Sequence, residues 1–288
     1  MKVLITGAGG QLGRALQRTA PAGAQIVALG RDGLDIGDAA AVAGLVAAHA
    51  PDLVINAAAY TAVDRAESEE AQAFRINGQA PGHLAAAAHA QGARFIHVST
   101  DFVFDGTAGS PYAPDHPTAP LGVYGVSKFA GEEAVRSAHP QALIVRTAWV
   151  YGVTGTNFVR TMLRLMAERD KVGVVADQIG TPTCADSLAR ALWALDAAGA
   201  RGTHHWTDSG AASWYDFAVA IQEEAVAIGL LDRAVPIAPI ATSDYPTPAQ
   251  RPSYSVLDKR SAIALIGLAA PHWRVNLRHN LGVIKADG

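Results

Sequence analysis

A chain of 288 residues with 50% hydrophobic content is long enough for a large core and one or two domains. Its net charge of −3 offers no basic surface for nucleic acid. The single cysteine, Cys184, excludes a disulfide framework and a cysteine-based zinc site within one chain, and it fits a reducing compartment. The opening "MKVLITGAGG" has too short an apolar run for a signal peptide, and no uninterrupted apolar window reaches about 18 residues, so we expect a cytoplasmic protein without a membrane span.

Strand-like and helix-like runs alternate through the first half of the chain. Short apolar runs rich in β-branched residues predict strands over residues 2–7, 24–30, 52–59, 93–100 and 142–152. Helical patterns lie between them, over residues 11–19, 39–50, 67–89 (with a break near Pro81) and 124–138. Continuous apolar strands that alternate with helices are typical of a parallel sheet covered on both faces. The fold class is therefore α/β, with a Rossmann-type doubly wound parallel sheet.

After Gly152 the strict alternation fades. Residues 172–183 predict a strand and a turn, residues 185–198 a helix, and the proline-rich stretch 235–252 a loop. We expect a dinucleotide-binding domain over residues 1–152 and roughly 183–200. A smaller mixed α/β substrate-binding domain would take roughly 153–182 and 201–288. The earlier loop 105–122 is long enough to be a lid or a binding segment.

Gly7, Gly10 and Gly13 in "TGAGGQLG" directly follow the first predicted strand and open a helix. Glycines there let the backbone approach a pyrophosphate, whose charge is favoured at a helix N-terminus. The alternative is a plain strand-to-helix turn, because the spacing is G-x-x-G-x-x-G and not G-x-G-x-x-G. The position between a strand and a helix favours a dinucleotide site.

The second strand of such folds usually ends in an acid that binds the adenosine ribose of NAD. Here Gly30 and Arg31 stand at that position. A guanidinium could pair with a ribose 2′-phosphate, which favours NADPH and leaves NADH possible. The alternative is a solvated loop arginine beside Asp32. Asp35 and Ile36 follow and could line the adenine.

The stretch "YGVSK" places Tyr124 one helical turn before Lys128 on a single helix face. An ammonium beside a phenol would lower the pKa of the phenol and make it a usable proton donor and acceptor. Alone, the pair could be an exposed helical pair without a task. In "STD", Ser99 or Thr100 could donate a hydrogen bond to a carbonyl oxygen, or serve only as a cap or turn residue. Their shared position at the carboxyl ends of predicted strands favours catalysis.

With "NAAAYTAVDRAE", "STDFVFDG", "VYGVSKFAGE", "RTAWVYG", "DQIGTPT" and "YPTPAQRP", the chain resembles the dTDP-4-dehydrorhamnose reductases. These are extended short-chain dehydrogenases/reductases. The resemblance implies a catalytic set of Thr100, Asp101, Tyr124 and Lys128. It implies cofactor contacts from Gly7, Gly10, Gln11, Leu12, Gly13, Asp35, Ile36, Ala57, Ala58, Ala59, Tyr124 and Lys128. It implies sugar-nucleotide contacts from Thr61, Val63, Thr100, Trp149 and Arg251.

The resemblance implies hydride transfer from NAD(P)H to the C4 ketone of a nucleotide-linked sugar, by a monomer or homodimer that binds neither nucleic acid nor membrane. Some relatives bridge a dimer through Mg²⁺. Ala15 stands where one acidic ligand would be, so we expect no metal.

Two alternatives stay open at this stage. One is another sugar-nucleotide epimerase or dehydratase, although a dehydratase would normally add a second acid beside "STD". The other is a non-catalytic regulatory subunit of the methionine adenosyltransferase type. Trp206 and Trp214 are interpreted as core aromatics, and the neighbours His204 and His205 would point to opposite sides of a strand. Arg251 could be a surface arginine that braces its loop, but Pro252 favours an extended backbone that projects its side chain outward.

Overall fold

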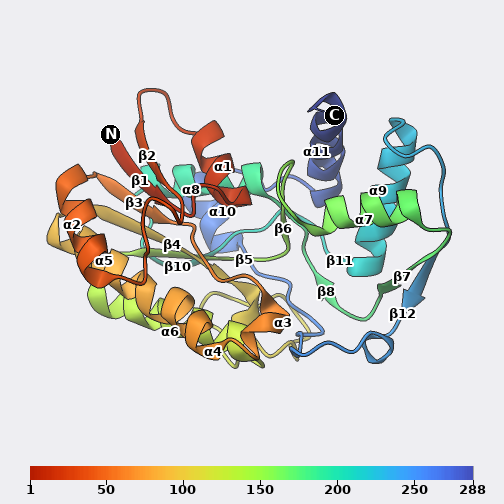
Figure 1. Ribbon diagram of the computed structural model, residues 1–288, viewed down its shortest axis with the longest axis horizontal. Coiled ribbons are helices and arrows are strands. Elements are labelled where there is room, and N and C mark those ends of the chain that lie inside the picture. Colours follow the sequence, from red (N-terminus) through yellow and green to blue (C-terminus); the bar gives the residue numbers. More distant parts are fainter. Residues whose placement is uncertain (288) are drawn as a thin grey trace.

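The computed structural model describes residues 1–287; Gly288, the last residue of the expected second domain, lies outside them. The central layer is a parallel six-stranded sheet with the strand order β10-β5-β4-β3-β1-β2 (Figure 1). Its strands are β1 (Lys2–Thr6), β2 (Gln25–Leu29), β3 (Leu53–Asn56), β4 (Arg94–Thr100), β5 (Leu143–Thr147) and β10 (Gly202–His205). The expected doubly wound α/β architecture is confirmed.

Helices cover both faces of this sheet, which explains the uninterrupted apolar strands (Figure 1). Val3 and Ile5 enter the hydrophobic cluster beneath α1 (Gln11–Arg18) and α8 (Ala185–Ala197). Leu4, between them, enters the opposite cluster beneath α2 (Ala39–His49) and α5 (Ala80–Ala90). A further helix on the α8 side is α10 (Arg260–Ile266), and α6 (Val123–Ala138) packs beside α5.

The expected break near Pro81 is wrong. After the short helices α3 (Val63–Ala66) and α4 (Glu70–Ala73), the π-helix η1 (Phe74–Gln79) runs directly into α5. Pro81 lies in the first turn of α5. A proline is tolerated there because its missing N–H has no role in the first turn.

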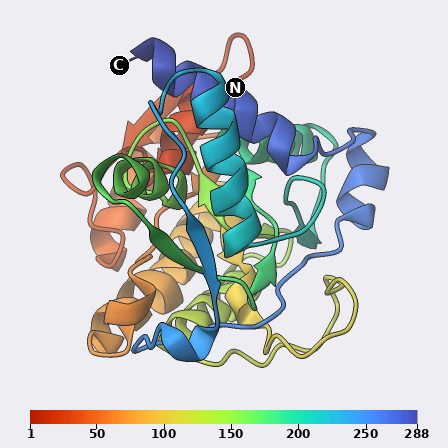
Figure 2. The ribbon, with the colours of Figure 1, turned by 90° about the vertical axis from the view of Figure 1, so that its right-hand side faces the viewer.

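A second lobe lies beside the sheet, to the right in Figure 1 and toward the viewer in Figure 2. It contains three helices and several short strand pairs around a separate hydrophobic cluster. Its helices are α7 (Phe158–Glu168), α9 (Trp214–Ala227) and α11 (Trp273–Asp287). Its strands are β6 (Val150–Tyr151), β7 (Val172–Val175), β8 (Ile179–Gly180), β9 (Thr183–Cys184), β11 (Ala212–Ser213) and β12 (Ile237–Ile240).

Three details differ from the sequence expectations. The run 142–152 is not one strand, since β5 ends at Thr147 and β6 pairs with β9 instead. The stretch 235–252 is not all loop, since β12 pairs with β7. Residues 202–205, placed by the expected division in the second domain, form β10 at the edge of the central sheet. The division into two domains otherwise stays a prediction.

Alternation along β10 turns its two histidines to opposite sides, as expected. His205 is buried, whereas His204 is partly exposed. The ring Nδ1 of His205 lies 3.0 Å from the carbonyl oxygen of Tyr112, which ties the loop 105–122 to the sheet. No helix within residues 1–287 combines the length and apolar composition that a membrane crossing requires.

Candidate active site

The glycine-rich turn lies at the carboxyl end of β1, against the segment that follows β3. Gly7 has a left-handed backbone (φ +69°), and a Cβ on it would lie 2.6 Å from the backbone nitrogen of Ala58. A Cβ on Gly13 would lie 2.2 Å from the carbonyl oxygen of Gly7. Only glycine fits both positions, so the turn and the Ala57–Ala59 segment form one surface. This surface lies where the chain reverses its strand order, the usual ligand crevice of such sheets.

Asn56 supports this surface from below. Its Oδ1 accepts hydrogen bonds from the hydroxyl of Thr6 (2.8 Å) and from the backbone N–H of Ala58 (3.1 Å). Its side-chain amide lies 3.1 Å from Nδ1 of the buried His97. Asn56 therefore links three adjacent strands, β1, β3 and β4. Neither Asn56 nor His97 was expected at the site, although a polar residue at the end of a buried strand, as Asn56 is, was a usable signal.

The loop after β2 carries the residues expected around the adenosine. Arg31 is exposed and Ile36 is buried. Asp35 forms an ion pair with Arg75, a residue of η1 that was not expected at the site. The hydrogen bond from Arg75 holds the pKa of Asp35 below its ordinary value. The structure thus brings a second guanidinium to the same edge as Arg31.

Gln11 and Leu12 open α1 directly after the glycine turn. The Oε1 of Gln11 accepts a hydrogen bond from the side-chain amide of Asn157 (3.0 Å), and Leu12 is buried in the core. Asn157 also caps α7, since its Oδ1 accepts from the N–H of Arg160 (3.1 Å). The second lobe therefore reaches the predicted cofactor turn through one amide pair.

Lys128 is almost fully buried, and its ammonium donates a hydrogen bond to the carbonyl oxygen of Val98 (2.7 Å). Burial lowers the pKa of Lys128 to about 8. Tyr124, one turn earlier on α6, is half-buried, and burial raises the pKa of its phenol to about 12. The expectation that Lys128 lowers the pKa of Tyr124 is wrong, because desolvation of the phenol dominates. The phenol is consequently protonated at neutral pH.

Thr100 and Asp101 lie beside Tyr124 at the end of β4. The Thr100 hydroxyl donates to Oδ1 of Asp101 (3.0 Å) and accepts from the N–H of Phe102 (3.2 Å). Interaction with Thr100 lowers the pKa of Tyr124, although less than burial raises it. Burial raises the pKa of Asp101 to about 6, and a hydrogen bond from Ser255 partly offsets that effect. Ser255 brings the C-terminal part of the chain into the site.

Ser99 lies on the opposite side of β4 from Thr100, because side chains alternate along a strand. It faces α6, where Glu132 is fully buried. Arg146 of β5 binds both carboxylate oxygens of Glu132 (2.8 and 2.7 Å). Burial would raise the pKa of Glu132, yet the hydrogen bonds from Arg146 keep that pKa below its ordinary value. Of the two hydroxyls, Thr100 is therefore the one that belongs with Tyr124.

The residues expected to bind the sugar nucleotide form the far side of the site. Thr61 is exposed and Val63 is half-buried at the start of α3. Arg251 does not project outward as expected. Its guanidinium binds Asp64 (2.8 Å) and the carbonyl oxygen of its own loop residue Ala249 (3.1 Å). The loop that holds Arg251 is therefore joined to α3.

Trp149 lies where the chain leaves the central sheet for the second lobe. It has a left-handed backbone (φ +48°), which typically costs ~1–3 kcal/mol for a residue other than glycine and is concentrated at functional sites. Its indole stacks on that of Trp214, with ring centroids 3.5 Å apart and an interplanar angle of 6°. Both indoles line a small cavity together with Phe102, Gln178, Arg251, Pro252 and Ser255. Trp214 packs against the core of the second lobe, as expected, but it also lines this cavity, which the sequence did not indicate, whereas Trp206 is buried in the core.

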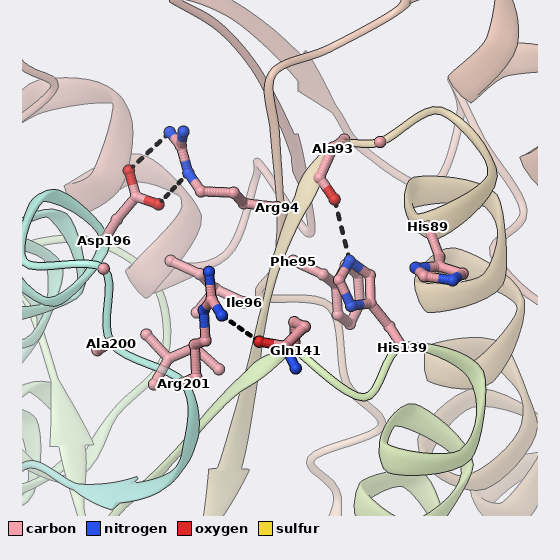
Figure 3. Close-up of a pocket in the computed structure, with 13 residues that line it drawn as sticks. His89, Ala93, Arg94, Phe95, Ile96, His139, Gln141, Asp196, Ala200 and Arg201 are labelled. Atoms are coloured by element: carbon pink, nitrogen blue, oxygen red, sulfur yellow. Dashed lines mark hydrogen bonds and ion pairs between the residues drawn. The ribbon is translucent and has the colours of Figure 1, made fainter.

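A larger cavity, of about 290 Å³, lies at the opposite end of the sheet (Figure 3). Its walls come from the amino ends of β4 and β5, and Arg94 and Arg201 in it are already bound to Asp196 and Gln141. Ligands of doubly wound sheets bind at the carboxyl ends, so this cavity is not the catalytic site. Within residues 1–287 no group of three or more His, Cys, Asp or Glu residues is arranged to hold a metal ion, and Ala15 lies in the core.

The fold, the glycine turn and the Thr100–Tyr124–Lys128 arrangement define an extended short-chain dehydrogenase/reductase. A family model described as "RmlD substrate binding domain" matches residues 1–285, and the chain belongs to this dTDP-4-dehydrorhamnose reductase family.

Relatives and solved structures agree with that assignment. A curated dTDP-4-dehydrorhamnose reductase from Burkholderia thailandensis is 47% identical, over 95% of this chain and 96% of that protein. A crystal structure of a dTDP-4-dehydrorhamnose reductase from Clostridium acetobutylicum superposes with a TM-score of 0.93 at 39% identity, over 99% of this chain and 100% of that one. The Bacillus anthracis enzyme, in complex with NADP, gives a TM-score of 0.92 at 37% identity, over 98% and 99% of the two chains.

The raised pKa of Asp101 yields a prediction about stability. Its folded pKa of about 6 exceeds the ordinary value of 3.8, so ionisation of Asp101 destabilises the folded state. This destabilisation is absent well below pH 4, develops between pH 4 and 6, and is complete above pH 6. Because each pKa unit corresponds to ~1.4 kcal/mol, Asp101→Asn should stabilise the protein by up to ~3 kcal/mol at pH 8 relative to pH 4. Denaturant unfolding at the two pH values measures this difference. A stability difference from wild type that is independent of pH would contradict the prediction.

Proposed function

We propose that this protein reduces the C4 ketone of dTDP-4-dehydro-L-rhamnose to dTDP-L-rhamnose with NADPH, as the last step of dTDP-rhamnose synthesis. The observation that carries the proposal is the group of Thr100, Tyr124 and Lys128 beside a glycine-lined crevice. Gly7 and Gly13 let the turn pack closely on the backbone of Ala57 and Ala58 and on its own backbone, which brings the turn to the N-terminus of α1, where a pyrophosphate is favoured. The names of relatives that match nearly the whole chain support the choice of sugar nucleotide.

NADPH, when bound, supplies the hydride that reaches C4. Negative charge then grows on the ketone oxygen. Tyr124 transfers its phenolic proton to that oxygen, and its pKa of about 12 keeps the proton in place until the charge develops. The Thr100 hydroxyl turns its single proton from Asp101 to the same oxygen and stabilises it with a hydrogen bond. Lys128 holds the nicotinamide ribose through hydrogen bonds from its ammonium group.

The remaining crevice residues have proposed binding roles. The glycine turn with Gln11 and Leu12 holds the pyrophosphate, Ala57–Ala59 line the nicotinamide half, and Asp35 and Ile36 line the adenosine. Thr61, Val63, Trp149 and Arg251 contact the sugar nucleotide. A cytoplasmic location and a monomer or homodimer complete the proposal.

The purified chain alone tests this function. NADPH oxidation is followed at 340 nm with dTDP-4-dehydrorhamnose and a panel of other 4-keto sugar nucleotides, and the product configuration at C4 is determined by NMR. Stoichiometric oxidation with dTDP-L-rhamnose as the product is expected. Conversion of substrate without net NADPH consumption would instead identify an epimerase or a dehydratase. No turnover with any substrate would favour a non-catalytic partner protein.

Replacing Tyr124 by Phe removes the proton and keeps the ring, which packs edge-on against Phe102 (5.4 Å between centroids). Because general acid catalysis is typically worth ~10²–10⁴-fold, kcat should fall by about that factor while the fold survives. Tyr215→Phe, a phenol in the second lobe, serves as the control and should keep wild-type kcat. Near-normal kcat in Tyr124→Phe would remove Tyr124 from the mechanism.

Arg31 is exposed at the end of β2, where it could pair with a ribose 2′-phosphate. Charge-assisted hydrogen bonds contribute ~1.5–3 kcal/mol. Arg31→Ala should therefore weaken NADPH binding roughly 10- to 150-fold and leave NADH binding nearly unchanged. Isothermal titration with both cofactors measures this, with Arg164→Ala on α7 as the control. Equal losses for NADPH and NADH would show that Arg31 does not bind the phosphate.

Substitutions of Arg251 and of its partner Asp64 distinguish diphosphate binding by Arg251 from bracing of its own loop. If Arg251 binds the diphosphate, Arg251→Ala should raise KM for the sugar nucleotide roughly 10- to 150-fold with little change in kcat, since the diphosphate does not react. Asp64→Asn keeps the guanidinium and removes only its ion pair, so KM should stay within about 3-fold of wild type or fall. Similar increases in KM for both variants would instead show that Arg251 only braces its loop.

A further inference from the structure

We propose that Trp214 is a positioning residue for the sugar: it holds the indole of Trp149 in place, so that a stacked pair of indoles forms one wall of the substrate cavity. The proposal rests on the sugar-nucleotide role proposed for Trp149. It extends that role to a residue of the second lobe for which neither the sequence patterns nor the resemblance indicated a function.

The geometry around Trp149 is built from both lobes. Trp149 follows β5 of the central sheet, and its carbonyl oxygen accepts a hydrogen bond from the N–H of Thr183 (3.1 Å). Its backbone is left-handed, a conformation that a bulky residue does not keep without support from its surroundings. The hydrogen bond from Thr183 fixes the Trp149 carbonyl, and β6 pairs from Val150 onward, but neither contact positions the indole ring, so the place of the ring depends on the side chains packed against it.

Gly180 of β8 and Trp214, the residue that follows β11, supply this packing. Strand β8 pairs with β11, so that Gly180 lies opposite Ala212, and Trp214 begins the helix directly after β11. A Cβ on Gly180 would lie 2.5 Å from Cε2 of the Trp149 indole, so the ring occupies the space that any other side chain would need. Gly180 and Trp214 therefore define the position of the Trp149 ring together.

Trp214 is itself held rigidly. Ser213 and Asp216 form a reciprocal capping box at the start of α9, with the Asp216 N–H donating to the Ser213 hydroxyl (3.0 Å) and the Ser213 N–H to the Asp216 carboxylate (2.9 Å). Phe158 of α7 packs on the Trp214 ring at 4.6 Å. Despite this support Trp214 stays partly exposed and lines the cavity with Trp149. A ring that served only the core would be covered, as Trp206 is.

The ligand implied by this wall is the apolar side of a deoxysugar ring. Indole faces pack well against C–H groups and offer no charge to a phosphate. Arg251 lines the same cavity and offers the positive charge that a diphosphate requires. Trp214 would thus act on the sugar and not on the reacting oxygen, and its loss should change KM more than kcat.

The test is a double-mutant cycle between the two indoles, with KM for the 4-keto sugar nucleotide as the readout. An aromatic pair contributes enough that Trp214→Leu should raise KM roughly 5- to 10-fold, with NADPH affinity unchanged. Trp214→Phe should restore most of the loss. Because Trp214 acts through Trp149, adding Trp214→Leu to Trp149→Leu should cause no further increase.

Two further measurements distinguish a positioning role of Trp214 from a general loss of stability. Trp273→Leu, a buried tryptophan in the same lobe that is not stacked on Trp149, is the matched control and should leave KM unchanged. Stacked indoles give an exciton-coupled circular dichroism signal, which Trp214→Leu and Trp149→Leu should both abolish and which dTDP-L-rhamnose should perturb in wild type.

The outcomes are distinguishable. An absence of wild-type turnover rejects the proposed function itself. Unchanged KM in Trp149→Leu, with normal turnover, rejects the role of Trp149 and this proposal with it. Raised KM in Trp149→Leu but not in Trp214→Leu rejects only the positioning role of Trp214. Additive losses in the double variant, or an equal loss in Trp273→Leu, would show that Trp214 acts through general stability. If Trp214→Leu does not fold, the dichroism of Trp214→Phe decides: loss of the coupled signal supports the stacked pair, and a signal unchanged from wild type rejects the positioning role of Trp214.

Discussion

The buried ion pair between Glu132 and Arg146 is the interaction on which the catalytic geometry depends. It fastens α6, which carries Tyr124 and Lys128, to β5 of the central sheet through two hydrogen bonds. Arg146 also donates to the carbonyl oxygen of Pro114 in the long loop (3.1 Å). Breaking such a pair by removing one partner typically costs ~3–5 kcal/mol, a large part of a domain's stability. An ion pair of this strength therefore holds α6, and with it Tyr124 and Lys128, on the sheet.

The same helix face explains the charge balance of the site. Lys128 is desolvated, and the negative charge of Glu132 one turn later partly restores the pKa that burial lowers. Tyr124 lies nearer the crevice, where burial keeps its proton bound. A protonated phenol suits ketone reduction, which needs a proton donor on oxygen. Desolvation is thus the main cause of the raised pKa of Tyr124.

Several of the contacts that join the second lobe to the rest of the chain lie at the site. Asn157 binds Gln11 beside the glycine turn, Ser255 reaches Asp101, and Arg251 binds Asp64. Trp149 and Trp214 stack across the junction. These contacts link segments that lie far apart in the chain. The small cavity at this junction, lined by Phe102, Trp149 and Trp214 among others, is consequently formed by both lobes, which is suited to an enzyme that must bring a cofactor and a sugar nucleotide together.

The sequence alone determined the parallel sheet, the glycine turn and the helix that carries Tyr124 and Lys128, because these follow from local periodicity and from backbone needs at Gly7 and Gly13. It did not determine the pKa of Tyr124, since desolvation depends on surroundings that no spacing encodes. Only the tertiary structure decided four further features. These are the pairing of β10 with β5 and of β12 with β7, the turn at Trp149, the ion pair of Arg251 with Asp64, and the position of Trp214. Each depends on contacts between segments distant in the chain, which a local pattern of residues cannot specify.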